Sequence, residues 1–308
     1  MSTRGTYAYI LCGWHTRSDV PLTSVPTSVP SRESVDIVIQ IAAEPSAIAK
    51  YEGRAVFEHS AERSLIGIQD VAEFEVKGGM QIRIWPAAGA KQKDIEIFLF
   101  GPAWAALCHQ RGLLPLHASA ILTGGAITAF AGHCGTGKST TAACMSSLGY
   151  QVVADDILPV SFNQNIEPGA WPYLRRLKLQ NDSIKRLALT PTEPVSEALD
   201  KEKYFVRPKF VADDKWSRLE QLYLLEIDPS ASSISIDRIT GLDAVRVLID
   251  QTYHFQFVLG SGRFREHLEL CVQLASKIHV YRLRRPPSFD IGEGLGSLIC
   301  AQIQDVPA

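Results

Sequence analysis

The sequence lacks the features that mark several large protein classes. It contains no C-x-x-C pair, and its six cysteines stand at wide and irregular spacings. This pattern indicates neither a zinc ribbon nor a compact disulfide framework, and it is typical of reduced thiols in a cytoplasmic protein. The N-terminal stretch MSTRGTYAYILCGWHTRSD also lacks the long apolar core and the small-residue cleavage site of a secretory signal. We therefore expect a cytoplasmic location.

An excess of charge of either sign is absent as well. Thirty-one Lys and Arg against 33 Asp and Glu give a formal net charge of −2. The chain as a whole therefore has no positive charge that would attract nucleic acid, and we expect no nucleic-acid partner. The 308 residues are 46% hydrophobic and 21% charged, which is enough for one or two domains with a substantial buried core.

Long hydrophobic runs are also scarce, with one exception. From Gly112 to Gly137 the chain carries no Asp, Glu, Lys or Arg, which is longer than the roughly 20 residues that span a bilayer. Pro115 and the Gly124-Gly125 pair divide this run, and the pieces LHASAIL and AITAFAG have the length of strands. The run therefore predicts two buried strands joined by a hairpin turn, with no membrane partner.

The first hundred residues predict a small, mostly β domain (1–100). Short runs rich in Ile, Val, Phe and Tyr alternate there with turn residues, and a helix that ends at Gly112 follows them. The expected strands are 7–14, 35–41, 64–71, 73–78, 80–85 and 96–100.

In the remaining residues, 101–308, predicted strands and predicted helices both occur, and they predict an α/β domain in which helices cover a sheet. Beyond the hairpin, strands are expected at 151–156, 221–228 and 233–239, and a last strand at 279–285. Helices are expected at 241–259 and 264–278.

Residues Gly132 to Ser139, GHCGTGKS, match the pattern G-x-x-x-x-G-K-[ST]. Glycines let the main chain wrap closely around an anion, and the helix that begins near Lys138 adds the positive end of its dipole. The Lys138 ammonium can reach the β and γ phosphates, and the Ser139 hydroxyl can ligate Mg²⁺. Because a predicted strand precedes the loop and a predicted helix follows it, we expect a nucleotide-phosphate site with ATP and Mg²⁺ as cofactors. No base-reading loop is marked, so GTP also fits.

The apolar strand after this helix ends in two acids, Asp155 and Asp156. Adjacent residues on a strand point to opposite faces, so the two carboxylates are expected to do different work. One can hold Mg²⁺, directly or through water, while the other faces the substrate as a base.

Basic residues gather later in the chain. Such cations can stabilise a transferring phosphoryl group or form a solvated face, and the run RLRRPP around Arg282 is interpreted as solvated. The basic residues are Arg175, Arg176, Lys178, Lys203, Arg207 and Lys209.

The run LHASAIL…AFAGHCGTGKST…VVADDI resembles the C-terminal catalytic domain of the HPr kinase/phosphorylase family, and most of all the HPr-kinase-like proteins encoded beside bacterial lasso-peptide genes. The resemblance implies a P-loop fold of the phosphoenolpyruvate-carboxykinase-like type for the catalytic domain. By it His117 takes the place of the family's active-site histidine, Asp155 that of the general base, and Asp156 that of its neighbour near Mg²⁺. The expected catalytic residues are Asp155, His117 and Lys138, and the expected metal ligands are Ser139 and Asp156. The residues expected to hold the nucleotide are Gly132, Gly135, Thr136, Gly137, Lys138, Ser139, Thr140, Arg175 and Arg176.

The resemblance has one departure. The glycine-containing E-V-R-G-L-G signature that the HPr enzymes carry after the two acids, tied to phosphorolysis, does not occur in this sequence. We therefore expect an ATP- and Mg²⁺-dependent serine kinase that acts on a peptide or small protein, and the lasso-associated relatives suggest the C-terminal serine of a precursor peptide. A homo-oligomer is implied by the hexameric HPr kinases. Two alternatives are a small-molecule kinase that acts on free serine and a regulatory ATPase without a phosphoryl acceptor.

Overall fold

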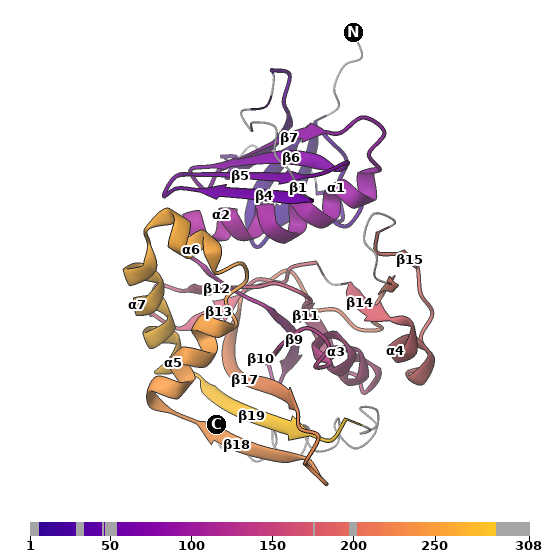
Figure 1. Cartoon of the computed structure of the whole chain (residues 1–308), viewed down its shortest axis with the longest axis vertical. Helices are drawn as coiled ribbons and strands as arrows, with labels where there is room; N and C mark the ends of the chain where they lie inside the picture. The colour runs from indigo at the N-terminus through magenta and orange to yellow at the C-terminus, as the bar shows by residue number, and fades with distance from the viewer. Residues whose placement is uncertain are drawn as a thin grey trace. The chain divides into compact units, whose positions relative to one another are not determined.

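The computed structural model describes residues 6–28, 34–44, 46, 54–174, 176–196 and 202–287, and it divides into two compact units (Figure 1). Met1–Pro115, Ser196–Asp200 and His254–Leu268 make up the first unit. The second contains Leu116–Val195, Lys201–Tyr253 and Glu269–Ala308. Within the described ranges, no helix is long and apolar enough to cross a bilayer.

The first unit contains a seven-stranded sheet. Its strands are β1 (Tyr7–Leu11), β2 (Trp14–Ser18), β3 (Ile37–Ile41), β4 (Ala55–His59), β5 (Arg63–Ile68), β6 (Ala72–Lys77) and β7 (Gln81–Pro86), in the spatial order β1-β2-β3-β7-β6-β5-β4. Period-two alternation of apolar and polar residues produces these strands, since Ile82 and Ile84 of β7 are buried while Arg83 between them is partly exposed. The parallel register of β3 and β7 sets Ile39 opposite Ile82. The β character expected for this region is confirmed.

The strand expected at 96–100 is wrong, because these residues are helical. They belong to α1 (Gln92–Phe98) and a π-helical turn (Leu99–Ala103), which lead into α2 (Trp104–Gln110), and the helices lie along one face of the sheet (Figure 1). A short apolar run cannot be distinguished from a buried helical segment by periodicity alone. The helix expected to end at Gly112 is confirmed.

The second unit is built around a nine-stranded sheet. The predicted hairpin is present as β9 (Ala118–Thr123) and β10 (Ala126–Ala131), which pair antiparallel across two glycines with positive φ. The strand β10 pairs in parallel with β17 (Ser217–Ile227), and β17 pairs in parallel with β19 (His279–Arg285). The carboxyl ends of β10, β17 and β19 therefore meet at one edge of the sheet, which is where ligands bind in sheets of this kind.

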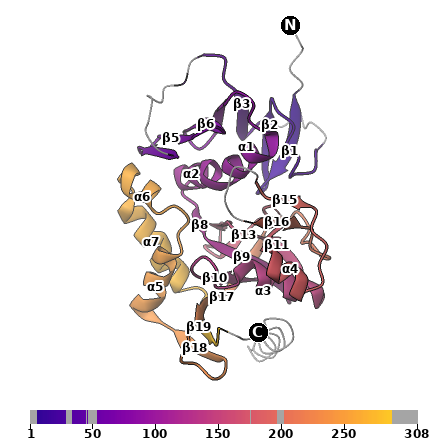
Figure 2. The same ribbon diagram turned by 45° about the vertical axis from the view of Figure 1, so that its right-hand side comes forward.

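Helix α3 (Lys138–Ser147) covers one face of β9 and β10 (Figure 2). Phe130, Met145 and Tyr223 are fully buried in the core between them. A smaller sheet packs beside α3 in the order β14-β16-β15. The other elements of this region are β8 (Leu114–Leu116), β11 (Gln151–Ala154), β12 (Leu158–Phe162), β13 (Pro168–Ala170), β14 (Leu177–Gln180), α4 (Asn181–Arg186), β15 (Glu193–Pro194), β16 (Lys203–Val206) and β18 (Ser235–Ile239).

The single helix expected at 241–259 is also wrong, because two helices occupy it. The first, α5 (Gly241–Asp250), ends before a turn, and α6 (Gln256–Ser261) follows. His254 has a φ of 50°, a left-handed conformation that a continuous helix does not allow. The helix expected at 264–278 is present as α7 (Phe264–Ala275).

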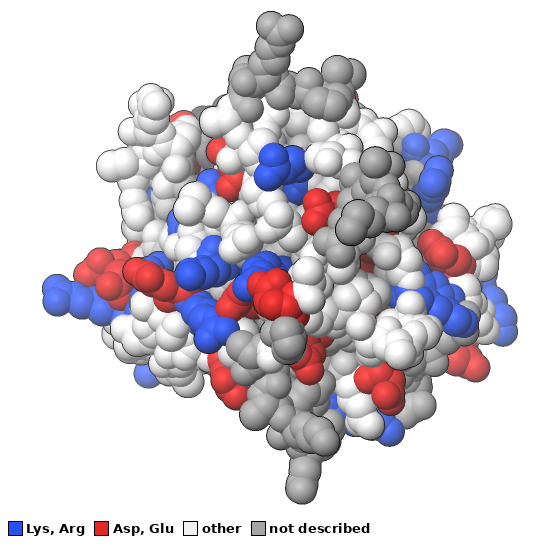
Figure 3. All heavy atoms as spheres, turned by 90° about the horizontal axis from the view of Figure 1, so that it is seen from above, with Lys and Arg blue, Asp and Glu red and all other residues white. Residues whose placement is uncertain are grey.

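Charges of both signs lie next to one another on the face of the molecule in Figure 3. Exposed ion pairs of the described residues include Arg246 with Asp243 and Arg284 with Asp237. Exposed pairs of this kind contribute little to stability, but they leave the surface mixed in sign.

Candidate active site

The predicted phosphate loop connects β10 to α3 at the carboxyl edge of the sheet. Its glycines have left-handed or otherwise positive φ values, 141° at Gly132, 89° at Gly135 and 104° at Gly137. A Cβ atom on Gly132 would lie 2.6 Å from the carbonyl oxygen of Leu225 and 2.8 Å from Oγ1 of Thr136. The glycine is therefore required for the close approach of the loop to β17, in addition to its conformation.

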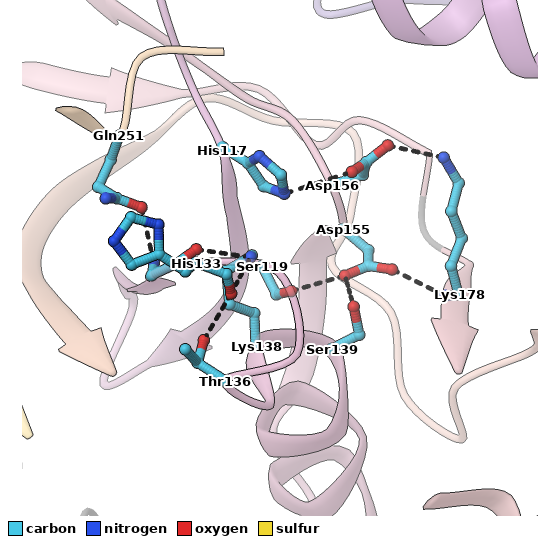
Figure 4. Close-up of polar contacts among 11 residues, drawn as sticks. His117, Ser119, His133, Thr136, Lys138, Ser139, Asp155, Asp156, Lys178 and Gln251 are labelled. Atoms are coloured by element: carbon cyan, nitrogen blue, oxygen red, sulfur yellow. Dashed lines mark hydrogen bonds and ion pairs between the residues drawn. The ribbon is translucent and has the colours of Figure 1, made fainter. Parts of the chain in front are cut away.

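Two side chains of the loop bond to the loop's own carbonyls. Lys138 Nζ donates to the carbonyl oxygens of Gly132 at 2.7 Å and of His133 at 3.2 Å, and Thr136 Oγ1 donates to His133 at 2.9 Å (Figure 4). Both side chains are almost completely buried. Burial lowers the pKa of Lys138, against the opposing effect of the two nearby aspartates. The Lys138 side chain lies within the loop and lines a hollow in the second unit, where an anion would enter.

Asp155 follows β11 directly and is 3% exposed. Its Oδ1 accepts hydrogen bonds from Ser119 Oγ at 2.6 Å and Ser139 Oγ at 2.7 Å, and its Oδ2 accepts the main-chain N–H of Lys178 at 2.8 Å. Burial raises the pKa of this carboxyl, and the three hydrogen bonds partly oppose the rise. The carboxylate is thus held in place by partners from three elements.

Asp156 points the other way and remains 27% exposed. Its φ of 74° turns the chain sharply, and its Oδ2 accepts from Lys178 Nζ at 2.7 Å while Oδ1 lies 3.7 Å from His117 Nε2 (Figure 4). Burial opposes ionisation, but the Lys178 charge, with His117 and Lys203, outweighs it and lowers the pKa of Asp156 to about 2. This carboxylate is ionised and open to the hollow.

His117 precedes β9 and faces Asp156. Its main-chain N–H donates to the carbonyl of Gln251 at 2.7 Å, and its ring lies 5.3 Å, centroid to centroid, from that of Tyr253. Burial lowers the pKa of His117 to about 4, although the charge of Asp156 acts in the opposite direction. The imidazole is therefore neutral at pH 7.

These groups surround one hollow of about 150 Å³ in the second unit. Four cations line it against two acids, so an anionic ligand is favoured there. The charged lining residues are Lys138, Lys178, Lys203, Arg285, Asp155 and Asp156, and Gly135, Gly137, Ser139, Thr140 and His117 also line it.

The arginines of the site differ from the expected ones. Arg176 does not line the hollow; its guanidinium lies 3.7 Å from the centre of the Phe205 ring. Arg175 lies outside the described residues. The interpretation of RLRRPP as a solvated run is wrong for Arg285, which is 6% exposed and donates to the carbonyl of Thr136 at 3.1 Å. The parallel pairing of β19 with β17 brings this residue to the edge where the loop lies.

Sequence reasoning missed Ser119 and Gln251. Ser119 could have been found, because it lies two residues after His117 in the predicted strand LHASAIL, where alternate residues share a face. Gln251 has no local signal, since its side chain reaches Gly132 across a sequence separation of 119 residues.

A magnesium ion fits this donor set. Mg²⁺ is bound in such sites by one or two protein oxygens, with waters and substrate phosphates as the other ligands. Ser139 and Asp155 offer a hydroxyl and a carboxylate at the mouth of the loop. A cluster of three or more His, Cys, Asp or Glu residues that would hold a metal without a substrate is not found in the described part of the chain.

No family model matches the sequence, and no curated protein matches it either. Among solved structures, the chain is similar to the Hpr(Ser) kinase/phosphatase from Coxiella burnetii, with 13% identity and a TM-score of 0.31. The similarity covers 62% of this chain and 88% of that chain. At this TM-score the likeness does not define the fold, and the chemistry of the site rests on its own residues.

Proposed function

We propose that this chain is a phosphotransferase that binds ATP with Mg²⁺ at the loop Gly132–Ser139 and transfers the γ-phosphoryl group to a serine hydroxyl. The observation that supports this most is the shared hollow. It combines a phosphate-binding loop, a buried carboxylate bonded to Ser139, and a second, accessible carboxylate beside His117. A site that only held a nucleotide would need no second carboxylate open to an acceptor.

The two aspartates have different roles in this proposal. Asp155 has its oxygens occupied by three hydrogen bonds and orients Ser139, so it belongs with the metal. Asp156 is ionised, accessible and close to His117, so it accepts the proton of the hydroxyl. This allocation reverses the one that the family resemblance implies.

The metal and the cations supply charge neutralisation. Mg²⁺, when bound with the nucleotide, would be held by Ser139 and Asp155 and would offset charge on the phosphates. Lys138 and Arg285 add positive charge from the loop side, and Lys178 and Lys203 add it from the smaller sheet. Positioning and charge neutralisation contribute most of the rate in phosphoryl transfer, because the protein has little covalent chemistry to do.

The acceptor follows from the family resemblance of the sequence and is a serine of a peptide or small protein. The C-terminal serine of a lasso-peptide precursor is the specific candidate.

The test is incubation of the protein with ATP labelled in the γ-phosphate and Mg²⁺. Three reactions run in parallel, with a serine-terminated peptide, with free serine, and without an acceptor. We expect label on the peptide. Label on free serine alone, or release of phosphate without any labelled acceptor, would contradict the proposed acceptor.

The matched pair of variants is Lys138→Ala and Lys185→Ala. Lys138 lines the hollow, whereas Lys185 is exposed on α4. We expect Lys138→Ala to lower transfer by about 100-fold or more, as the loss of a group aimed at developing charge does, and Lys185→Ala to have no effect. Equal activity of the two variants would overturn the site.

A further inference from the structure

Gln251, which directly follows α5, bonds to two parts of the site, and Figure 4 shows the bond made by its side chain. Its side-chain Oε1 accepts the main-chain N–H of Gly132 at 2.8 Å, and its main-chain carbonyl accepts the N–H of His117 at 2.7 Å. The residue is 5% exposed. One residue therefore joins the first residue of the phosphate loop to the histidine beside Asp156.

The bond to Gly132 matters because this glycine is held from two sides. Its N–H donates to Gln251, and its carbonyl accepts from Lys138 Nζ at 2.7 Å. A glycine has many main-chain conformations open to it, and a buried N–H without an acceptor is costly. Without the Gln251 oxygen, the chain at Gly132 would turn to find another partner, and the carbonyl that holds Lys138 would move with it.

The same turn also holds the imidazole of His117. Tyr253 lies two residues after Gln251, and its ring contacts that of His117 at a centroid distance of 5.3 Å. The turn that replaces the expected continuous helix is therefore the element that positions both the loop and the histidine.

We propose that Gln251 is a positioning residue. Its side chain fixes the main chain of Gly132, and thereby the position of Lys138, while its main-chain carbonyl holds the main chain of His117. This inference rests on the proposed function, since it assigns to Gln251 a part in nucleotide binding. It adds a residue outside the loop motif and outside the acid pair.

The first test follows amide hydrogen exchange by NMR in the nucleotide-free protein. In the wild type we expect the Gly132 amide to exchange slowly. In Gln251→Met, which keeps the length of the side chain but has no acceptor oxygen, we expect it to exchange at least about tenfold faster. The His117 amide should stay protected in this variant, because its acceptor is the main-chain carbonyl. Gln251→Glu retains an acceptor oxygen and should restore slow exchange at Gly132.

The second test measures the affinity for a non-hydrolysable ATP analogue with Mg²⁺. We expect Gln251→Met to bind about tenfold more weakly than the wild type, which corresponds to the loss of one hydrogen bond of the loop. The matched control is Gln221→Met, since Gln221 is a buried glutamine of β17 whose Oε1 accepts the Tyr223 hydroxyl. This control should bind like the wild type.

The outcomes separate the two proposals. Rapid exchange of the wild-type Gly132 amide, or unchanged affinity in a folded Gln251→Met protein, would overturn the role of Gln251 and leave the proposed function standing. A wild type that binds no nucleotide would overturn the proposed function itself, and the role of Gln251 in binding with it.

Discussion

The hydroxyl of Ser139 donates to Oδ1 of Asp155 at 2.7 Å, which ties the first turn of α3 to the residue after β11. The neighbouring Asp156 makes no such contact and instead pairs with Lys178 at 2.7 Å. The two adjacent carboxylates thus have different environments. Asp155 is buried and its pKa is raised, whereas Asp156 is accessible and its pKa is lowered. Such a separation is common where two acids do different work.

Substitution of each acid tests this division of roles. We expect Asp156→Asn to retain ATP affinity and to lose phosphoryl transfer by about 100-fold or more, because the proton acceptor is removed. We expect Asp155→Asn to stay folded, since an amide can meet the same neighbours, and to lose the Mg²⁺-dependent part of ATP binding. Titration calorimetry with and without Mg²⁺ measures the ATP affinity of both variants, and transfer assays measure their turnover. Full turnover by Asp156→Asn would show that it is not the base.

Ser119→Ala should alter the pH dependence of the reaction. The Ser119 hydrogen bond is the strongest of the contacts that lower the pKa of Asp155 against burial, so its removal raises that pKa further. Because the ionised form is the one required, activity should be lost at a higher pH, and the acidic limb of the kcat/KM profile should move upward. Ser147→Ala, an exposed serine at the end of α3, is the control. An acidic limb at the same pH in all three proteins would contradict the role of Asp155.

Gly132→Ala should be more damaging than Gly135→Ala. Both glycines have positive φ, which costs an alanine about 1–2 kcal/mol. A Cβ on Gly132 would in addition overlap main-chain atoms of Leu225, whereas one on Gly135 would meet open space. We expect a loss of more than about 2 kcal/mol of unfolding free energy for Gly132→Ala. Urea denaturation of both variants measures the difference, and equal losses would argue against the close contact.

Acid should destabilise the first unit through His267. This residue is 4% exposed, and burial lowers its pKa to about 4, whereas an unfolded histidine titrates near 6.5. Between these values the unfolded chain binds more protons, so stability is present at pH 7 and is lost as the pH falls from about 6.5 to about 4. We expect His267→Leu to reduce the slope of unfolding free energy against pH by about 1 kcal/mol per unit. An unchanged slope in urea titrations at several pH values would contradict this.

The local parts of the site could be predicted from the sequence because each is encoded in a short segment. The loop, its flanking strand and helix, and the strand before the two acids all lie between Ala118 and Asp156, and each has a periodicity or a motif of its own. The hairpin likewise follows from its paired glycines. These elements form where they were expected.

The remaining supports of the site could not be predicted, since they arise from pairings distant in sequence. The sequence around Arg285 is typical of a solvated basic run, and only the parallel pairing of β19 with β17 brings this residue to Thr136. The turn that contains Gln251 is not visible in the sequence, because the apolar spacing typical of a helix continues from 241 to 259, through His254 with its left-handed conformation. Tertiary contacts decide both cases.

The order in which these parts are synthesised has a consequence for the newborn protein. The phosphate loop is encoded early, yet two of its supports, Gln251 and Arg285, are separated from their loop partners by 119 and 149 residues. Because a chain emerges from the ribosome in sequence order, the motif is exposed well before its supports are made. Under the proposed function, we therefore expect a nascent chain to expose the loop motif before the residues that support it are made, and to bind nucleotide only late in translation.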